Sequence, residues 1–435
     1  MSYPTKTLHP DEKIKAGDLG KKISRVGAGI AVVGLAISLV LTMSSGADPA
    51  AAGHVSKWSR FLHAYVIGWS YIASISIGMM WLILLHYLVR GRWVTVVRRL
   101  CEAMASAFPV VWIVGLGFVL PVLAGNKDLY YWTTDAAHDP ILNHALAHKL
   151  GWLSPGFWGV RYIAYGAIYS GLAWYFAKKS REQDESGDAK ITDHLRVVAG
   201  PGMILFAFTT CFLAFDVLMS LLPKWYSTIY GVSFWASGCV GAFSALALLV
   251  LYTQRTGRLV HSINEEHYHD IGKWMFSFTF FWAYTAFSQF MLQWYGNLPE
   301  ETVFYKYRMF GDWQWMSIAI LVGYWAFPFV FLMSRWTKRI KTTLVFFAVW
   351  QLVFHWIDLY WNVMPNYDWS VHDGLNVGPL AGPIANHHVG LSGVDVTVWI
   401  AMIGFLLVGI GRNLKGNLIP VKDPTLGLSL AHEQL

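Results

Sequence analysis

Long apolar runs alternate with short polar segments along the whole chain of 435 residues. Each run is about 20 residues long, which is the length that a helix needs to cross a hydrocarbon core of about 30 Å. The pattern therefore predicts an all-α polytopic membrane protein with ten transmembrane helices. The predicted spans are 25–42, 62–88, 104–124, 157–177, 199–222, 231–252, 274–295, 313–333, 342–361 and 395–411.

Composition and charge agree with a multi-pass membrane protein. Charged residues make up 14% of the chain, against about a quarter in globular proteins. Of the 33 Lys and Arg residues, 25 lie in the amino-terminal tail up to Arg25, in alternate connections and in the carboxyl-terminal tail. Cytoplasmic segments carry such an excess, so both termini are predicted to be cytoplasmic. The net charge of +7 then matches anionic lipid and gives no reason to expect nucleic-acid binding.

The first span and the cysteines bear on how the chain is processed and on its cofactors. The first span, with its basic flank, also has features of a secretory signal peptide, but we interpret it as a membrane anchor. Cys101, Cys211 and Cys239 are isolated in the sequence, with no C-x-x-C or C-x-x-C-H motif. This spacing excludes covalent haem c, a four-cysteine iron–sulfur cluster and a zinc ribbon within the chain.

Two aspartates, Asp216 and Asp358, lie inside predicted spans, each seven residues before a proline. A carboxylate in hydrocarbon costs about 2.5–3.5 kcal/mol on insertion scales, so such residues usually face a bundle interior or a water path. Their shared offset predicts an internal repeat, in which spans two to five and six to nine form two four-helix bundles. The predicted organisation is a cytoplasmic tail (1–24), a flanking span (25–42), the two bundles (62–222 and 231–361), an outer loop (362–394) and a last span with its cytoplasmic tail (395–435).

The surroundings of the two aspartates differ in the sequence. Arg161 enters the preceding span from the same face as Asp216, so we expect an ion pair, either purely structural or part of a proton path. In the second half Met316 occupies the position equivalent to Arg161, and that half lacks the arginine. Instead His355 lies one helical turn before Asp358, which suggests either a proton relay or a hydrogen-bonded knot between helices.

The remaining histidines give weaker signals. His63 at the outer start of the second span is a further proton-path candidate, and His86 lies 23 residues later, too far away to share a haem with it. His144 and His148 have the i, i+4 spacing of metal ligands, but we favour a polar surface facing a partner, and no metal site is predicted. The cluster at 261–270 could gather protons at the cytoplasmic face, although a solvated loop is the preferred interpretation.

Four blocks together resemble a known family: FDVLMSLLPKWYSTIYG (215–231), YHDIGKWMFSFTFFWAYTAF (268–287), FSQFMLQWYGNLPEET (287–302) and SRWTKRIK (334–341). They are similar to the smaller polysulfide-reductase-type (NrfD-like) membrane subunit of bacterial alternative complex III, a quinol:electron-acceptor oxidoreductase. The resemblance covers nearly the whole chain. It implies an inner-membrane subunit built from two four-helix bundles.

The resemblance also implies a division of labour. The chain would bind no cofactor and hold no catalytic residue. It would lie beside a sister membrane subunit that handles quinol, an iron–sulfur subunit and multihaem cytochrome c subunits on the outer side. Any coupling of quinol oxidation to proton movement would fall on Asp216 and on His355 with Asp358.

Two other functions are compatible with parts of the sequence. A secondary transporter built from two four-helix repeats would have broken helices that meet near the middle of the membrane. A cytochrome b-like protein would need facing histidines inside the spans, and only His63, His86 and His355 lie in or near them. We therefore expect a subunit of a respiratory complex, with the transporter as the alternative.

Overall fold

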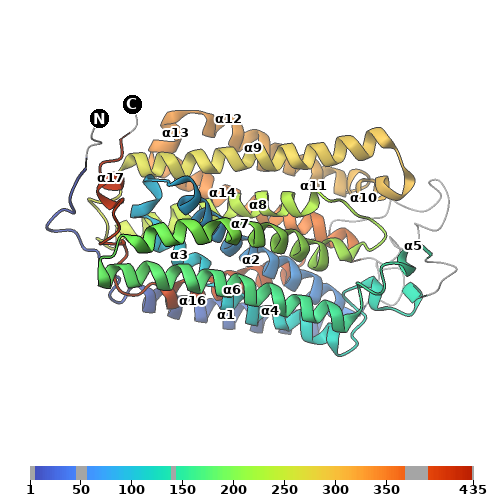
Figure 1. Ribbon diagram of the computed structural model, residues 1–435. Helices are drawn as coiled ribbons and strands as arrows, with labels where there is room; N and C mark the ends of the chain where they lie inside the picture. The colour runs from blue at the N-terminus through green and yellow to red at the C-terminus, as the bar shows by residue number, and fades with distance from the viewer. Residues whose placement is uncertain (1–4, 46–55, 139–143, 368–389, 434–435) are drawn as a thin grey trace.

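The computed structural model describes residues 5–45, 56–138, 144–367 and 390–433. Within these ranges the chain is helical, apart from turns and one isolated bridge between Lys15 and Asn417. The helices run side by side in an elongated bundle (Figure 1). The long helices are α1 (Leu19–Ser44), α2 (Lys57–Val89), α4 (Phe108–Leu123), α6 (Pro155–Ser186), α7 (Lys190–Val217), α8 (Tyr230–Arg255), α9 (Glu265–Gly296), α14 (Lys341–Val363) and α16 (Gly393–Asn413).

Shorter helices connect or complete these elements. The predicted span at 313–333 consists of α11 (Trp313–Ala319), a π-helical segment η5 (Ile320–Ala326) and α12 (Phe327–Met333). The others are η1 (Trp93–Val96), α3 (Arg98–Ala105), η2 (Tyr131–Thr133), η3 (Ala136–His138), α5 (His144–Ala147), η4 (Met219–Leu221), α10 (Pro299–Met309), α13 (Arg335–Arg339), η6 (Met364–Asn366) and α17 (Leu426–Leu430).

Eight helical segments of the described chain are long and apolar enough to cross a membrane, which indicates a multi-pass membrane protein. The helices α6 and α9, of 32 residues each, also extend along the bundle in Figure 1, but their sequences are less apolar. Both include charged ends, such as the KKSREQDES sequence that closes α6. The eight segments support the membrane class, and the topology of ten spans remains a prediction.

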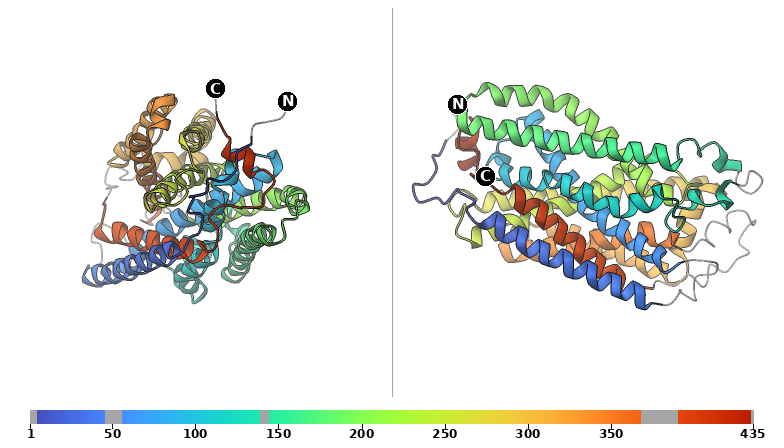
Figure 2. Two further views of the ribbon diagram at one scale, coloured as in Figure 1. Left: turned by 90° about the vertical axis from the view of Figure 1, so that its left-hand side faces the viewer. Right: turned by 90° about the horizontal axis from the view of Figure 1, so that it is seen from below.

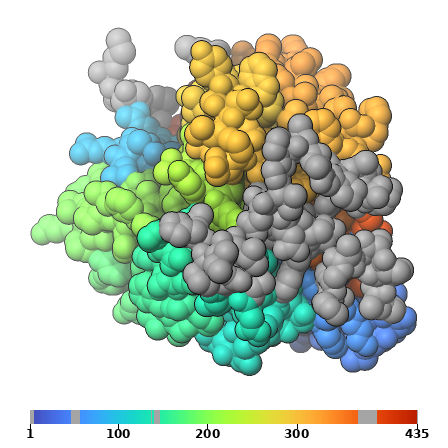
Figure 3. Space-filling view, turned by 90° about the vertical axis from the view of Figure 1, so that its right-hand side faces the viewer, coloured from blue at the N-terminus to red at the C-terminus, as the bar shows by residue number. Residues whose placement is uncertain are grey.

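Both tails of the described chain lie at the same end of the bundle (Figure 1). They contact each other there, with Lys6 Nζ 2.9 Å from Glu433 Oε1 and Ala16 N donating to Gly416 O at 2.8 Å. A chain whose tails meet at one end crosses the bundle an even number of times. Figure 3 looks at the opposite end, with the connection after α4 (teal) low in the view and the α9–α10 region (gold to orange) high in it.

Helix α2 lies at the centre of the packing. In its most apolar stretch, 83% of the residues are buried inside the protein. It packs on α3, α4 and α7 on one side and on α8, α14 and α16 on the other. Around it, α6 packs on α4 and α7, whereas α9 packs on α8 and α12. The end-on view of Figure 2 shows the α1–α16 pair at the edge of this arrangement.

Helices α1 and α16 approach each other closely because small residues line their contact. A Cβ on Gly27 would lie 2.6 Å from Gly404 O, and one on Gly411 would lie 2.5 Å from Gly20 O. Small residues are typical of helix contacts in membranes, where close backbone approach replaces the hydrophobic driving force of water. The pair is thus a rigid flank beside the central helices.

Candidate functional site

Asp216 is the penultimate residue of α7, and Arg161 of α6 pairs with its carboxylate. Arg161 Nε donates to Oδ2 at 2.7 Å and Nη2 donates to Oδ1 at 2.9 Å, which is a bidentate geometry. A negative charge at the carboxyl end of a helix is unfavourable, because the helix dipole is negative there. The arginine compensates this charge, so the predicted ion pair is confirmed.

Two aromatic side chains complete the Asp216 site. Trp152 Nε1 donates to Oδ1 at 2.9 Å and the Tyr165 hydroxyl donates to Oδ2 at 2.6 Å. The guanidinium of Arg161 lies over the Trp152 ring, 4.0 Å from its centroid. With four donors on one carboxylate, this site joins the start of α6 to the end of α7.

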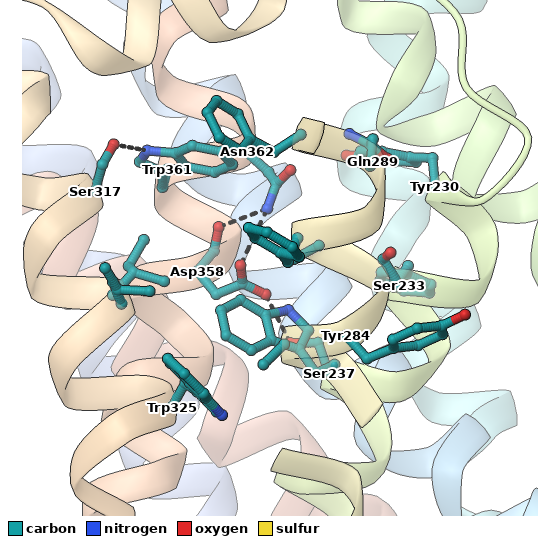
Figure 4. Close-up of a pocket in the computed structure, with 18 of the residues that line it drawn as sticks. Tyr230, Ser233, Ser237, Tyr284, Gln289, Ser317, Trp325, Asp358, Trp361 and Asn362 are labelled. Atoms are coloured by element: carbon teal, nitrogen blue, oxygen red, sulfur yellow. Dashed lines mark hydrogen bonds between the residues drawn. The ribbon is translucent and has the colours of Figure 1, made fainter. Parts of the chain in front are cut away.

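Asp358 occupies a different environment, five residues before the end of α14. Ser237 Oγ of α8 donates to its Oδ2 at 2.7 Å, and Asn362 Nδ2 lies 3.3 Å from Oδ1 (Figure 4). Trp282 of α9 also hydrogen-bonds the carboxylate. All these donors in the described chain are neutral, so the carboxylate has no bonded counter-cation there.

Ser237 bridges Asp358 to His355, so the couple predicted from their spacing is indirect. Its Oγ lies 2.8 Å from His355 Nδ1, and His355 Nε2 lies 2.8 Å from Ser74 Oγ on α2. Ser74 in turn donates to Tyr71 O at 2.9 Å. The residues from Asp358 to Ser74 form a relay that links α14, α8 and α2, and every member is at least 96% buried.

The relay can exist in two hydrogen-bond arrangements. In one, a protonated Asp358 donates to Ser237, Ser237 donates to His355 Nδ1, and His355 donates from Nε2 to Ser74, which donates to Tyr71 O. In the other, Asp358 is ionised and accepts from Ser237, Ser237 accepts from His355 Nδ1, and His355 accepts at Nε2 from Ser74, which then no longer donates to Tyr71 O. Hydroxyl groups both donate and accept, and a neutral imidazole has one nitrogen of each kind. Switching between these arrangements accompanies the passage of a proton along the relay, so the geometry is suited to proton transfer.

Two glycines of α8 make room for the relay. A Cβ on Gly241 would lie 2.8 Å from His355 Cδ2, and a Cβ on Gly238 would lie 2.8 Å from Ser74 Cβ. Either side chain would separate α8 from its neighbours. The close approach of α2, α8 and α14 at this level therefore depends on these positions.

A buried arginine is present in the second half as well, but it forms no ion pair with the aspartate, in agreement with the expectation from Met316. Arg308 lies on α10 and is fully buried. Its guanidinium donates to Trp361 O at 3.0 Å, to Asn362 O at 2.9 Å and to Phe304 O at 2.7 Å. The arginine thus caps the carboxyl end of α14 instead of pairing with the aspartate. The comparison of span positions missed it because it comes from a connecting helix.

A cavity of about 640 Å³ borders the relay and opens between α9 and the α11–η5 segment. Its wall includes Asp358 and Ser237 from the relay, together with Asn362 (Figure 4). Most of the lining is apolar or aromatic, including Trp282, Trp325, Tyr284, Phe287 and Phe290. The π-helical segment forms part of this wall, and π-helical turns are frequent at functional sites.

His63 does not belong to the relay. Its Nδ1 lies 2.8 Å from Ser59 O on its own helix, and its Nε2 has no hydrogen-bond partner among the described residues. Its neighbour Arg60 instead forms an ion pair with Asp395 at 2.7 Å, which joins α2 to α16. His63 therefore lies at the outer start of α2 and makes no contact with Asp358 in the described chain.

The end of the bundle where the two tails lie carries an ionic cluster that the sequence analysis did not identify. Arg98, which is fully buried, lies 2.6 Å from Asp423, 3.3 Å from Glu102 and 3.3 Å from His86 Nε2. Burial raises the pKa of Asp423, but the charge of Arg98 more than offsets this and the pKa is lowered. His86 is therefore part of the hydrogen-bond network around Arg98.

The segment at 261–270 is more ordered than the predicted solvated loop. Asn264 and His267 form a capping box at the start of α9, and both His267 and Asp270 are buried. Burial raises the pKa of Asp270, but hydrogen bonds from His432 and Lys273 outweigh it and the pKa is lowered. The cluster anchors the carboxyl-terminal tail on α9, which corrects the preferred interpretation.

The structure describes only part of the remaining features from the sequence analysis, which are possible metal ligands, the loop at 362–394 and the cysteines. No group of three or more His, Cys, Asp or Glu side chains that could hold a metal is found in the described part of the chain. Most of the outer loop at 362–394 lies outside the described residues. Cys101 and Cys239 are buried and Cys211 is half-buried, and all three are free thiols in packed surroundings.

One signal in the sequence could have identified the wider site. Gln351, His355, Asp358 and Asn362 follow one another at intervals of four, three and four residues, which places four polar side chains on one face of α14. Gln351 Nε2 donates to Thr279 Oγ1 at 2.6 Å, deeper in the same bundle. The stripe as a whole marks the polar face of the helix.

No family model matches the sequence of this chain, and no curated protein matches it.

Proposed function

We propose that this chain is a membrane subunit of a bacterial respiratory quinol:electron-acceptor oxidoreductase of the alternative complex III type. In this proposal it scaffolds the complex in the inner membrane and conducts protons through its second bundle. It crosses the membrane ten times with both termini in the cytoplasm, and its two repeats are residues 62–222 and 231–361. The family assignment rests on the four sequence blocks at 215–231, 268–287, 287–302 and 334–341.

The observation that carries the proton role is the buried relay from Asp358 through Ser237 and His355 to Ser74. An uncompensated carboxylate is costly at such depth. A histidine within one hydroxyl of it provides a second group that exchanges protons near neutral pH. Since Asp216 is fixed by Arg161, we assign proton transfer to Asp358 and His355 and a structural role to Asp216.

The proposed partners are a sister membrane subunit of the same type, an iron–sulfur subunit and multihaem cytochrome c subunits. Electron transfer and the main quinol chemistry are assigned to those partners, and this chain itself carries no redox cofactor. The chain should therefore purify from its native membrane with haem c and iron–sulfur clusters. Purification without them, under conditions that keep membrane complexes intact, would refute the proposal.

The proton role is tested with Asp358→Asn in the intact complex reconstituted in vesicles. The amide keeps the size of the side chain but does not titrate, so we expect quinol oxidation to continue with fewer protons taken up per electron. The control is the double variant Arg161→Met/Asp216→Asn, which removes the other aspartate together with its cation. An unchanged ratio of protons to electrons in Asp358→Asn would contradict the role.

The transporter alternative receives less support from the geometry. It calls for half-helices that end near the middle of the membrane. Here the span at 313–333 continues through its π-helical segment, and α3 and α4 are separated only by Ser106 and Ala107. Substrate uptake into vesicles that contain the chain alone, driven by an ion gradient, would favour the transporter.

A further inference from the structure

The cavity next to Asp358 has the dimensions and walls of a ligand site. Its volume of about 640 Å³ lies within the range of about 300–1,000 Å³ that is typical of small-molecule pockets. Its walls come from α8, α9, α10, the α11–η5 segment and α14. Side chains from α9, such as Tyr284 and Gln289, and from α11–η5, such as Ser317 and Trp325, line this cavity (Figure 4).

The mouth opens sideways among apolar side chains. Phe280, Tyr284, Phe287 and Leu321 line the cavity and are between 51% and 61% exposed. In a membrane these side chains face lipid, so a ligand would enter from the bilayer and would carry an apolar part. A water-soluble metabolite has no comparable route through this wall.

The deep end of the cavity selects the polar part of the ligand. Among the residues that the structure describes, the lining contains the Asp358 carboxylate and no Lys or Arg, so a phosphate or carboxylate head group would be repelled. Ser233 Oγ and Trp325 Nε1, both on the wall, are buried and have no hydrogen-bond partner in the described chain. Buried polar atoms are usually satisfied, so the two atoms indicate a missing partner with an oxygen. A bare acyl chain would satisfy none of these groups.

We infer that this cavity binds a neutral, hydroxyl-bearing aromatic ring on an apolar tail, of the hydroquinone class. One ring hydroxyl donates to Asp358, and the ring oxygens face the unsatisfied groups of the wall. Trp282 and Phe290 provide flat apolar surfaces for the ring. The choice of a hydroquinone over other phenols rests on the proposed function. The inference concerns binding and hydrogen bonding to the relay, without electron transfer in this chain.

The inference is tested by photolabelling the full chain in lipid nanodiscs with an azido-hydroquinone that carries a ten-carbon tail. The label should appear on the tryptic peptides 274–306 and 309–335, which contribute opposite walls of the cavity. An unlabelled hydroquinone with the same tail should compete for this site. Competition by tetraphenylphosphonium instead would indicate a site for apolar cations, and competition by phosphatidylglycerol would indicate a lipid site. Either result would overturn the inference.

Variants of α9 locate the label within the structure. Ala283→Trp fills the cavity from its wall and should reduce labelling at least about tenfold, since a tenfold change corresponds to the loss of one good contact. Leu292→Trp adds the same bulk at a position that is 66% exposed and outside the cavity, and it should leave labelling unchanged. If Ala283→Trp is not monodisperse, Ala286→Phe fills the same cavity with a smaller ring. Equal labelling of the filled variant and the control would refute the site.

The outcomes for this site and for the proposed function are separable. Labelling is measured on the chain without partners, so it does not depend on assembly of the complex. If the chain is not labelled but Asp358→Asn still lowers proton uptake, the ligand site is refuted and the proposed proton path is supported. If the chain is labelled but does not purify with haem c from its native membrane, the ligand site is supported and the assignment to a respiratory complex is refuted.

Discussion

The two aspartate-bearing helix ends use the same components in different ways. Each has a buried arginine that stacks on aromatic rings: Arg161 lies 4.0 Å from the Trp152 centroid, and Arg308 lies 3.7 Å from the Phe304 centroid. Arg161 gives its hydrogens to the carboxylate of Asp216, whereas Arg308 gives them to backbone carbonyls. The acceptor of the arginine's hydrogen bonds thus determines whether the neighbouring aspartate is paired with a cation or is hydrogen-bonded only by neutral donors.

The difference follows from where each helix ends. Helix α7 ends one residue after Asp216, so the carboxylate lies at the negative end of the helix dipole, where a cation is favourable. Helix α14 continues five residues beyond Asp358, and its last carbonyls accept the hydrogens of Arg308. A shared position relative to a proline therefore does not imply a shared charge state.

The largest expected effect is that of Arg161→Met. This change leaves the Asp216 carboxylate buried without its cation, which typically destabilises a protein by about 3–5 kcal/mol. We expect a strong loss of monodisperse protein in detergent and a lower thermal midpoint. Size-exclusion chromatography and thermal unfolding measure both.

The double variant Arg161→Met/Asp216→Asn provides the control for this pair. It removes both charges, so it should recover most of the stability that Arg161→Met loses. A double variant that is no more stable than Arg161→Met would show that the arginine acts through its stacking on Trp152 and not through the carboxylate.

The next effect in size is that of Arg308→Met. It removes three hydrogen bonds to carbonyls but leaves no charge unpaired, so the expected loss is about 1–3 kcal/mol. The same thermal measurement should rank it between wild type and Arg161→Met. A loss as large as that of Arg161→Met would mean that Arg308 also balances Asp358 over a longer distance, and the contrast between the two halves would fail.

The sequence was informative where the signal is periodic. Eight of the ten predicted spans coincide with helical segments that are long and apolar enough to cross a membrane, and the other two, 157–177 and 274–295, lie within α6 and α9. The positions of Arg161 and Asp216 on neighbouring helices predicted their contact. Both inferences depend on local spacing and on the antiparallel course of neighbouring helices. They required no knowledge of how the two halves pack.

The sequence was less informative where contacts come from distant segments. Ser74 and Ser237 are 163 residues apart, and no local pattern distinguishes these serines from others in the spans. Arg308 lies in a connection, where a basic residue ordinarily indicates a solvated loop. The cavity depends on the divergence of α9 from α11, which is a property of tertiary packing and not of either helix alone.

A smaller and more specific effect is expected for Ser237→Ala. The change removes the hydroxyl between His355 and Asp358 and keeps both titrating groups. Proton uptake by the reconstituted complex should slow about tenfold, which corresponds to about 1.4 kcal/mol in the barrier. Ser237→Thr keeps the hydroxyl and should retain the rate. Unchanged uptake in Ser237→Ala would mean that the serine is only a packing contact.

The smallest expected effect is that of Asp270→Asn, which changes a carboxylate outside the predicted spans and is measured as a function of pH. The pKa of Asp270 is lowered, because its bonds to His432 and Lys273 outweigh the effect of burial, so its ionised form stabilises the folded chain. This contribution, about 0.5–1 kcal/mol, should be present above the unfolded value near pH 4 and lost as the pH falls below it. Thermal midpoints measured from pH 6 to pH 3 should therefore converge between wild type and Asp270→Asn at the acid end. Curves that stay parallel over this range would show that Asp270 contributes through packing alone.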